Sequence, residues 1–216
     1  MLEPLQYEFF VRGLIAATVV GGLCGLVGVY IVLRRMSYIG HGLSHAVFGG
    51  AVVSYVMSFN FYIGASAWGF LSALLINATT RRRPIIGADA AIGIITTASF
   101  ALGVALISRY RTFTRSFEAA LFGNILGVTE RDLVAIAAVS AGAAAIVFLI
   151  YKQLLFVTFD PEVARFYGVR TDWIDTLFSI MLAGTVVVSM QVLGVTLIAA
   201  AIVIPPIVAR LLTVSF

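Results

Sequence analysis

The sequence predicts an all-α, polytopic helical membrane protein with about seven transmembrane helices. Hydrophobic residues make up 61% of its 216 residues, charged residues only 11%, and the mean hydropathy is +1.07. A soluble domain of this length has too small a core to bury that much apolar surface. A β-barrel would show short alternation of apolar and polar residues, which is absent. We therefore expect a single transmembrane domain over residues 1–216, in the cell inner (plasma) membrane.

Seven apolar runs are long enough to cross a hydrocarbon core about 30 Å thick. They cover about residues 9–33, 36–57, 62–78, 89–108, 133–151, 173–192 and 195–212. The first run carries a stripe of small residues that is typical of close helix packing, namely Gly21, Gly22, Gly25 and Gly28. Asp89 stands at the start of the fourth run, where we expect it to be the N-cap rather than a ligand for ion release. The last two runs are separated only by a tight turn around Gly194.

The segment from Arg109 to Asp132 lies between the fourth and fifth runs and has mixed character. Its first part, RYRTFTRSFE, is too charged to span a membrane, and the following AALFGNILGV is apolar but too short. We interpret it as a surface helix or a partly re-entrant one. If this segment crossed the membrane, the orientation of every later span would be inverted.

The distribution of Lys and Arg predicts the orientation, because cytoplasmic loops are enriched in both. Nine of the 14 basic residues fall on one side of the expected topology: Arg34, Arg35, Arg81, Arg82, Arg83, Lys152, Arg165, Arg170 and Arg210. The other side has Arg12, Arg109, Arg111, Arg115 and Arg131. The first side is therefore expected in the cytoplasm, with the N-terminus outside.

The second run contains both histidines of the chain, His41 and His45. On a helix they lie on one face, about 6 Å apart along the axis, and His45 comes about 15 Å after the arginines at the membrane surface. Ionisable groups in mid-membrane are costly and usually functional. We interpret the pair as metal ligands in a permeation path, with Ser37 and Ser44 as candidates for a supporting role. The alternative is a pair of polar residues hydrogen-bonded within the bundle.

Residues 159–168, FDPEVARFYG, predict a short and sharply bounded helix between the fifth and sixth spans. Asp160 is suited to the N-cap, Pro161 to the first helical position and Glu162 to the first turn, while Gly168 is suited to end the helix. This segment is either an ordinary capped loop or a rigid cytoplasmic peg for a partner.

Five segments, in this order, resemble the permease subunits of bacterial ABC importers for manganese, zinc or iron(II), the metal-type ABC-3 family. They are RRMSYIGHGLSHAVFGGAVVSY, DAAIGIITTASFALGVALIS, LFGNILGV, FDPEVARFYGV and VVVSMQVLGVTLIAAAIVIPPIVARLLT. The sequence departs from the family in two places, because His41 stands where Asp is usual and Gly49 where Pro is usual. Members also continue past the RLLT-like end with a further hairpin, which this sequence lacks.

The resemblance implies the membrane-spanning subunit of an ATP-driven importer, with no catalytic residues and no permanently bound cofactor. The expected cargo is Mn, Zn or Fe(II), and the sequence does not indicate which. Expected partners are a second permease copy, cytoplasmic ATP-binding subunits, an extracytoplasmic metal-binding protein and the lipid bilayer. No nucleic acid is expected, and the chain has no GxxxxGK[ST] motif of its own. The residues matching the family's coupling helix are Asp160, Glu162, Ala164, Arg165 and Gly168.

Two other functions fit parts of the sequence. A proton-coupled secondary metal carrier without an ATPase is the main alternative, but the apolar runs contain no carboxylate in mid-span and the two halves show no obvious repeat. A membrane metalloenzyme would need a third ligand and a general base, and the HGLSH pattern lacks the Glu found in HExxH metalloproteases.

Overall fold

The computed structural model describes residues 3–36, 38–59, 61–82, 87–110 and 121–213, and all regular structure in them is helical. The all-α prediction is thus confirmed. The helices are η1 (Glu3–Gln6), α1 (Glu8–Leu33), α2 (Ile39–Val56), α3 (Phe61–Arg82), α4 (Ala88–Tyr110), η2 (Ile125–Gly127), α6 (Glu130–Phe159), α7 (Pro161–Phe166) and α8 (Thr171–Leu212).

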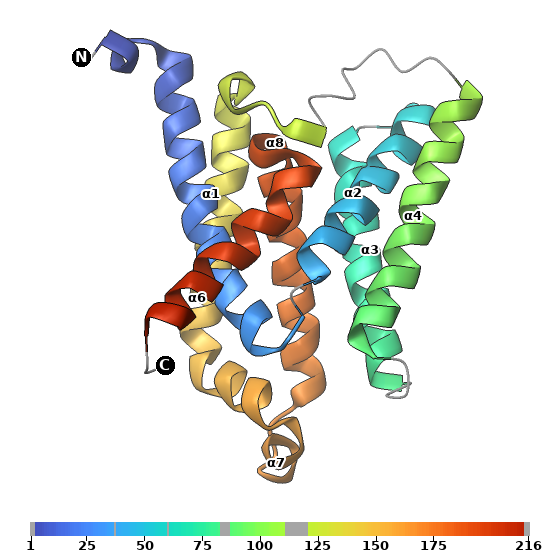
Figure 1. Cartoon of the computed structure of the whole chain (residues 1–216), viewed down its shortest axis with the longest axis vertical. Coiled ribbons are helices and arrows are strands. Elements are labelled where there is room, and N and C mark those ends of the chain that lie inside the picture. Colours follow the sequence, from blue (N-terminus) through green and yellow to red (C-terminus); the bar gives the residue numbers. More distant parts are fainter. Residues whose placement is uncertain (1–2, 37, 60, 83–86, 111–120, 214–216) are drawn as a thin grey trace.

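The long helices form a bundle with two distinct ends (Figure 1). The N-terminus and η2 lie at one end, and α7 projects from the other. Among the described residues, α1, α4, α6, α8 and residues 63–81 of α3 are long and apolar enough to cross a membrane. With α2 and the two arms of α8, these helices supply the expected seven segments.

Helix α8 is 42 residues long but is interrupted at Gly194, where the backbone is non-helical at φ 70° and ψ 168°. In Figure 1 its first arm rises from α7 and its second arm returns toward the C-terminus. These torsion angles belong to a region that is open almost only to glycine. The tight turn expected at Gly194 is therefore confirmed.

The described residues directly before α6 lie at the end of the bundle where the N-terminus lies. Helix α4 ends and α6 begins at that end (Figure 1), so the connection between them starts and finishes on the same side of the bundle. The Asn124 amide donates to the Gln191 carbonyl at 3.0 Å, and the Thr196 hydroxyl donates to the Leu121 carbonyl at 2.9 Å. In the described part of the Arg109–Asp132 segment, the residues before α6 thus form a surface connection that is hydrogen-bonded to α8 on both sides of its turn. Residues 111–120 lie outside the described residues.

Helix α2 packs between α3, α4 and α8, and 13 of its 18 residues are buried. Two glycines allow this packing. A Cβ at Gly49 would overlap the Ser99 carbonyl of α4, and one at Gly50 would overlap the Trp68 side chain of α3. Small residues thus bring the helix with the histidine pair into backbone contact with both neighbours.

Two expectations about α1 and α4 need correction. Of the α1 glycine stripe, only Gly28 packs closely, against Ile202 of α8, while nothing lies within 4 Å of a Cβ at Gly21, Gly22 or Gly25. Asp89 lies in the first turn of α4, one residue inside the helix, and so is not its N-cap. An acidic group there still complements the helix dipole.

Candidate functional site

The two histidines of α2 face each other. The Nε2 atoms of His41 and His45 are 3.1 Å apart, and the two rings meet edge to face with centroids 4.5 Å apart. Because the residues are one turn apart, the helix alone brings them together. The predicted pairing of the imidazoles is present in the structure.

Aromatic rings flank the pair on both sides. The His45 ring lies edge to face on Phe100 with centroids 4.7 Å apart, and the His41 ring is 5.4 Å from that of Tyr38. Phe100 is halfway along α4, so the pair lies halfway between the ends of the bundle. The His45 Nδ1 atom is buried without a hydrogen-bond partner in the part of the chain that the structure describes.

Ser44 lies between the histidines in sequence but does not contact their rings. Its hydroxyl is fully buried and is 2.8 Å from the His41 carbonyl and 3.2 Å from the Val195 carbonyl of α8. It therefore ties α2 to the second arm of α8, just after the Gly194 turn. Ser37, the other candidate, lies outside the described residues.

The spacing of the two Nε2 atoms suits a shared metal ion. Two imidazole nitrogens at about 2.0–2.1 Å from one tetrahedral ion lie roughly 3.3 Å apart. The described residues contain no group of three or more His, Cys, Asp or Glu side chains that could hold a metal. The pair is therefore an incomplete ligand set, open to water or to ligands from another molecule.

The second candidate element, α7, has the predicted boundaries. The Asp160 carboxylate accepts a hydrogen bond from the Val163 amide at 2.9 Å, and Pro161 occupies the first turn. At the other end Gly168 has φ 81°, and the amides of Gly168 and Val169 donate to the carbonyls of Arg165 and Ala164. This pattern is a Schellman motif, which fixes the end of the helix.

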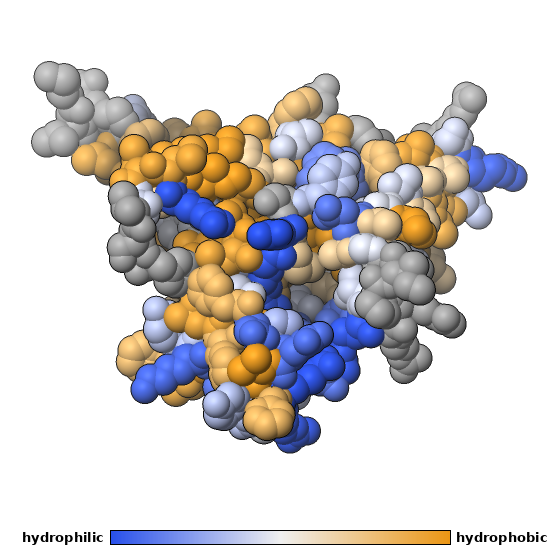
Figure 2. All heavy atoms as spheres, turned by 60° about the horizontal axis from the view of Figure 1, so that its bottom comes forward, coloured by the Kyte–Doolittle hydropathy of each residue, from blue (hydrophilic) through white to orange (hydrophobic). Residues whose placement is uncertain are grey.

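Helix α7 presents an apolar surface at the tip of the bundle. Phe166 and Tyr167 are 88% and 73% exposed, whereas Ala164 is fully buried against the rest of the chain. Figure 2 turns this end forward and shows hydrophilic residues gathered around the projecting tip. Exposed aromatic groups within a polar rim are typical of protein interfaces.

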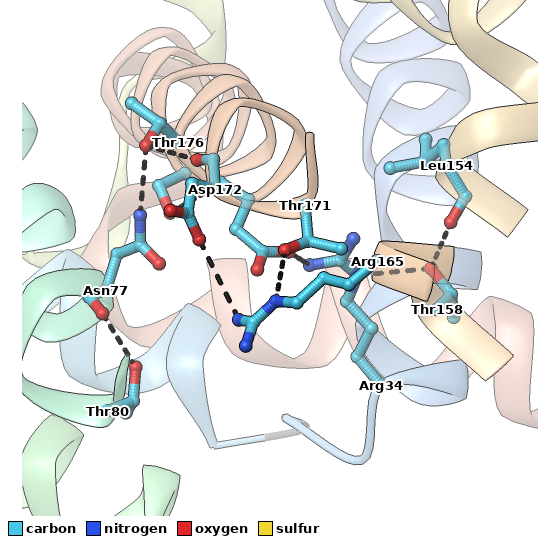
Figure 3. Close-up of polar contacts among 11 residues, drawn as sticks. Arg34, Asn77, Thr80, Leu154, Thr158, Arg165, Thr171, Asp172 and Thr176 are labelled. Atoms are coloured by element: carbon cyan, nitrogen blue, oxygen red, sulfur yellow. Dashed lines mark hydrogen bonds and ion pairs between the residues drawn. The ribbon is translucent and has the colours of Figure 1, made fainter. Parts of the chain in front are cut away.

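A polar network surrounds the first turns of α8, residues 171–178, which we call the α8 foot (Figure 3). Arg165 of α7 donates to the Thr171 hydroxyl at 2.8 Å. From α3, Arg81 pairs with Asp172 at 2.6 Å and the Asn77 amide donates to Thr176 at 3.3 Å.

Arg34, at the end of α1, also reaches the foot. It pairs with Asp175 at 2.7 Å, donates to the Thr158 hydroxyl of α6 at 3.2 Å, and lies 4.4 Å above the Phe178 ring. Sequence reasoning missed these contacts, because Thr158 and Asp175 follow Arg34 by 124 and 141 residues in the chain. A charge at a span end was the only available signal.

Comparisons with known proteins agree with this architecture. The family model for the ABC 3 transport family matches residues 6–216. The manganese transport system membrane protein MntC of Halalkalibacterium halodurans is 36% identical over 211 residues, covering 98% of this chain and 72% of the relative. A probable iron transport system membrane protein of Haemophilus influenzae is 35% identical, covering all of this chain and 79% of the relative.

Two solved structures have the same fold. PsaBC from Streptococcus pneumoniae, in complex with Fab, aligns with a TM-score of 0.83 and 36% identity over 99% of this chain and 77% of that one. An inward-facing conformation of a putative metal-chelate type ABC transporter aligns with a TM-score of 0.66 over 95% of this chain and 79% of that one. Its identity is 14%, so it supports the fold alone.

Proposed function

The chain belongs to the ABC 3 transport family, and from this premise we propose that it is the membrane-spanning subunit of an ATP-driven importer of a divalent transition-metal ion. The observation that carries the proposal is the His41–His45 pair, with its Nε2 atoms 3.1 Å apart halfway along the bundle. Relatives named for manganese and iron transport support a first-row metal as cargo. Neutral imidazole is a good ligand for such ions.

In this proposal, the histidine pair binds the ion only transiently. Two imidazoles are too few for a closed site, which takes about four ligands. We propose that a second copy of the chain brings its own pair to the same path, so that a homodimer completes the coordination. Incomplete, exchangeable coordination suits transport because the ion must also leave. The metal is thus cargo, and no permanently bound cofactor is required.

ATP hydrolysis belongs to separate cytoplasmic subunits in this proposal. The capped α7, with its exposed aromatic tip, serves as the peg that docks on them, and Asp160, Glu162, Ala164, Arg165 and Gly168 form its framework. Closure of the ATPase pair then moves α7 as a rigid body and drives alternating access. An extracytoplasmic metal-binding protein delivers the ion at the opposite end.

The positions of the acidic residues argue against a proton-coupled carrier. Among the described residues, the carboxylates lie at or near helix ends, where they cap, pair or face solvent, and none lies halfway along the bundle. Proton-coupled carriers use carboxylates in mid-membrane.

The experiment is metal uptake into proteoliposomes containing the chain and its ATPase subunit, with Mn, Zn and Fe(II) in competition. The His41→Ala/His45→Ala variant should lose uptake of every metal but still co-purify with the ATPase subunit. Ser54→Ala, on the same helix, is the matched control and should transport normally. Unchanged uptake by the double variant would exclude the proposed path, and uptake driven by a proton gradient without ATP would favour a secondary carrier.

A further inference from the structure

Arg34 is a largely buried charge with partners on two other helices. Its side chain is 11% exposed and that of Asp175 is 24% exposed. Enclosing an ion pair costs several kcal/mol of desolvation, so its geometry must be held by good contacts. Here the contacts are the carboxylate of Asp175, the hydroxyl of Thr158 and the face of Phe178. One guanidinium thus fastens the end of α1 to both α6 and α8.

The two helices that Arg34 joins are the two supports of α7. Thr158 is in the last turn of α6, directly before α7, and Asp175 is in the α8 foot, directly after it. A displacement of α7 therefore acts on both partners of Arg34.

On its other side, Arg34 leads into the helix with the histidine pair. The amides of Arg35 and Met36 donate to the carbonyls of Val32 and Ile31, and Arg35 has φ 56°. These bonds form a Schellman motif that fixes the chain where it leaves α1. Helix α2 begins at Ile39, and His41 is in its first turn. The path from Arg34 to the pair is therefore short and held by hydrogen bonds at its start.

We propose that Arg34 is a positioning residue that transmits the movement of α7 to the α1–α2 connection and so to the His41–His45 pair. The inference rests on the proposed function. It adds the route by which a force applied at the cytoplasmic tip reaches a site halfway across the membrane. Arg34 itself contacts neither the ion nor the ATPase.

The chain contains a matched control at the opposite end of the bundle. Arg12 also joins α1 to α6, through an ion pair with Glu130 at 2.8 Å. That pair lies at the end of the bundle where the N-terminus lies, away from α7, and is more exposed. Arg12→Gln also removes an arginine ion pair between α1 and another helix, but at the first residue of α6, the end that is far from α7.

The first test measures coupling in proteoliposomes that contain the ATPase subunit. Arg34→Gln and Asp175→Asn should keep ATPase binding and ATP hydrolysis, but metal transported per ATP should fall at least tenfold. Arg34→Lys, which keeps the charge, should recover part of the coupling. Arg12→Gln should couple like the wild type. Normal coupling in Arg34→Gln, or an equal loss in Arg12→Gln, would overturn the assignment.

The second test needs no transport. Spin labels at Met57→Cys, directly after α2, and Arg170→Cys, between α7 and α8, in a Cys24→Ala background, report how firmly α2 is held relative to the α7 end of the bundle. We expect one narrow distribution with Arg34 or with Arg12→Gln, a broader one with Arg34→Gln, and an intermediate width with Arg34→Lys. Equal widths would overturn the inference. If the wild-type chain transported no metal, the proposed function would be refuted. The width of the distance distribution would still show whether Arg34 holds α2 in place relative to α7.

Discussion

Replacing Gly194 with Ala should open the turn between the two arms of α8. The backbone there has φ 70° and ψ 168°, and a residue with a Cβ pays about 1–3 kcal/mol to adopt such angles. The added Cβ would also overlap the Leu121 carbonyl oxygen and the Gly123 amide nitrogen, so the covering segment must shift. Strain and displacement thus act on the same turn.

The shift of the segment that covers the turn lowers the stability further. It weakens the hydrogen bond from the Asn124 amide to Gln191 and the one from Thr196 to Leu121, each worth about 0.5–1.5 kcal/mol. Together with the strain, the Gly194→Ala variant should lose about 2–6 kcal/mol of unfolding free energy. At about 2–4 °C per kcal/mol for a chain of this length, its thermal midpoint in detergent should fall by at least about 4 °C.

The matched control is Gly22→Ala, because nothing lies within 4 Å of a Cβ at that position. Alanine is the better helix former, so the midpoint of this variant should stay constant or rise slightly. Tryptophan fluorescence during heating measures both variants. A Gly194→Ala midpoint equal to that of the wild type would refute the reasoning, as would an equal fall in Gly22→Ala.

Two further predictions concern α7 and the packing of α2. Asp160→Ala removes the acceptor for the Val163 amide and should destabilise the helix start by about 1 kcal/mol, weakening ATPase co-purification, while Asp160→Asn should retain binding. Equal binding by both would contradict a role for the cap. Gly49→Ala should push α2 away from the Ser99 carbonyl and reduce metal uptake, whereas Gly93→Ala on α4 meets open space and should transport normally. Wild-type uptake by Gly49→Ala would show that this close approach is dispensable.

Local signals in the sequence were enough to predict α7 and the histidine pair. Asp160 and Gly168 act on backbone groups a few residues away, so their identities nearly determine where the helix begins and ends. His41 and His45 meet because a helix places residues four apart on one face. The turn at Gly194 was also predictable from a local signal, because a glycine interrupts an otherwise continuous apolar run.

Contacts between distant segments were not predictable. The partners of Arg34 depend on how α1, α6 and α8 are placed relative to one another. From the sequence, an arginine near the end of a span indicates only the orientation of that span in the membrane. The α1 glycines show the same limit, because small residues permit close packing without specifying which face is packed. Only Gly28 of that stripe meets another helix closely.

The buried Nδ1 atom of His45 has a consequence for how firmly the pair can hold an ion. When the pair is empty, one Nε2–H donates to the other Nε2. If His41 were the donor, neutral His45 would carry its hydrogen on Nδ1, where no acceptor is present among the described residues. The favoured tautomer therefore has His45 as the donor, with a bare Nδ1.

A metal ion that takes both Nε2 lone pairs displaces this proton, and a neutral His45 must then carry it on the enclosed Nδ1. Because Nδ1 is unsatisfied in either tautomer, the change that metal binding makes is mainly the loss of the hydrogen bond between the two Nε2 atoms, worth about 0.5–1.5 kcal/mol, which weakens binding by roughly 2- to 13-fold. When the ion departs, the proton returns to Nε2 and the penalty is relieved. In the proposed path, the His45 side chain that would bind the ion would thus also favour its release.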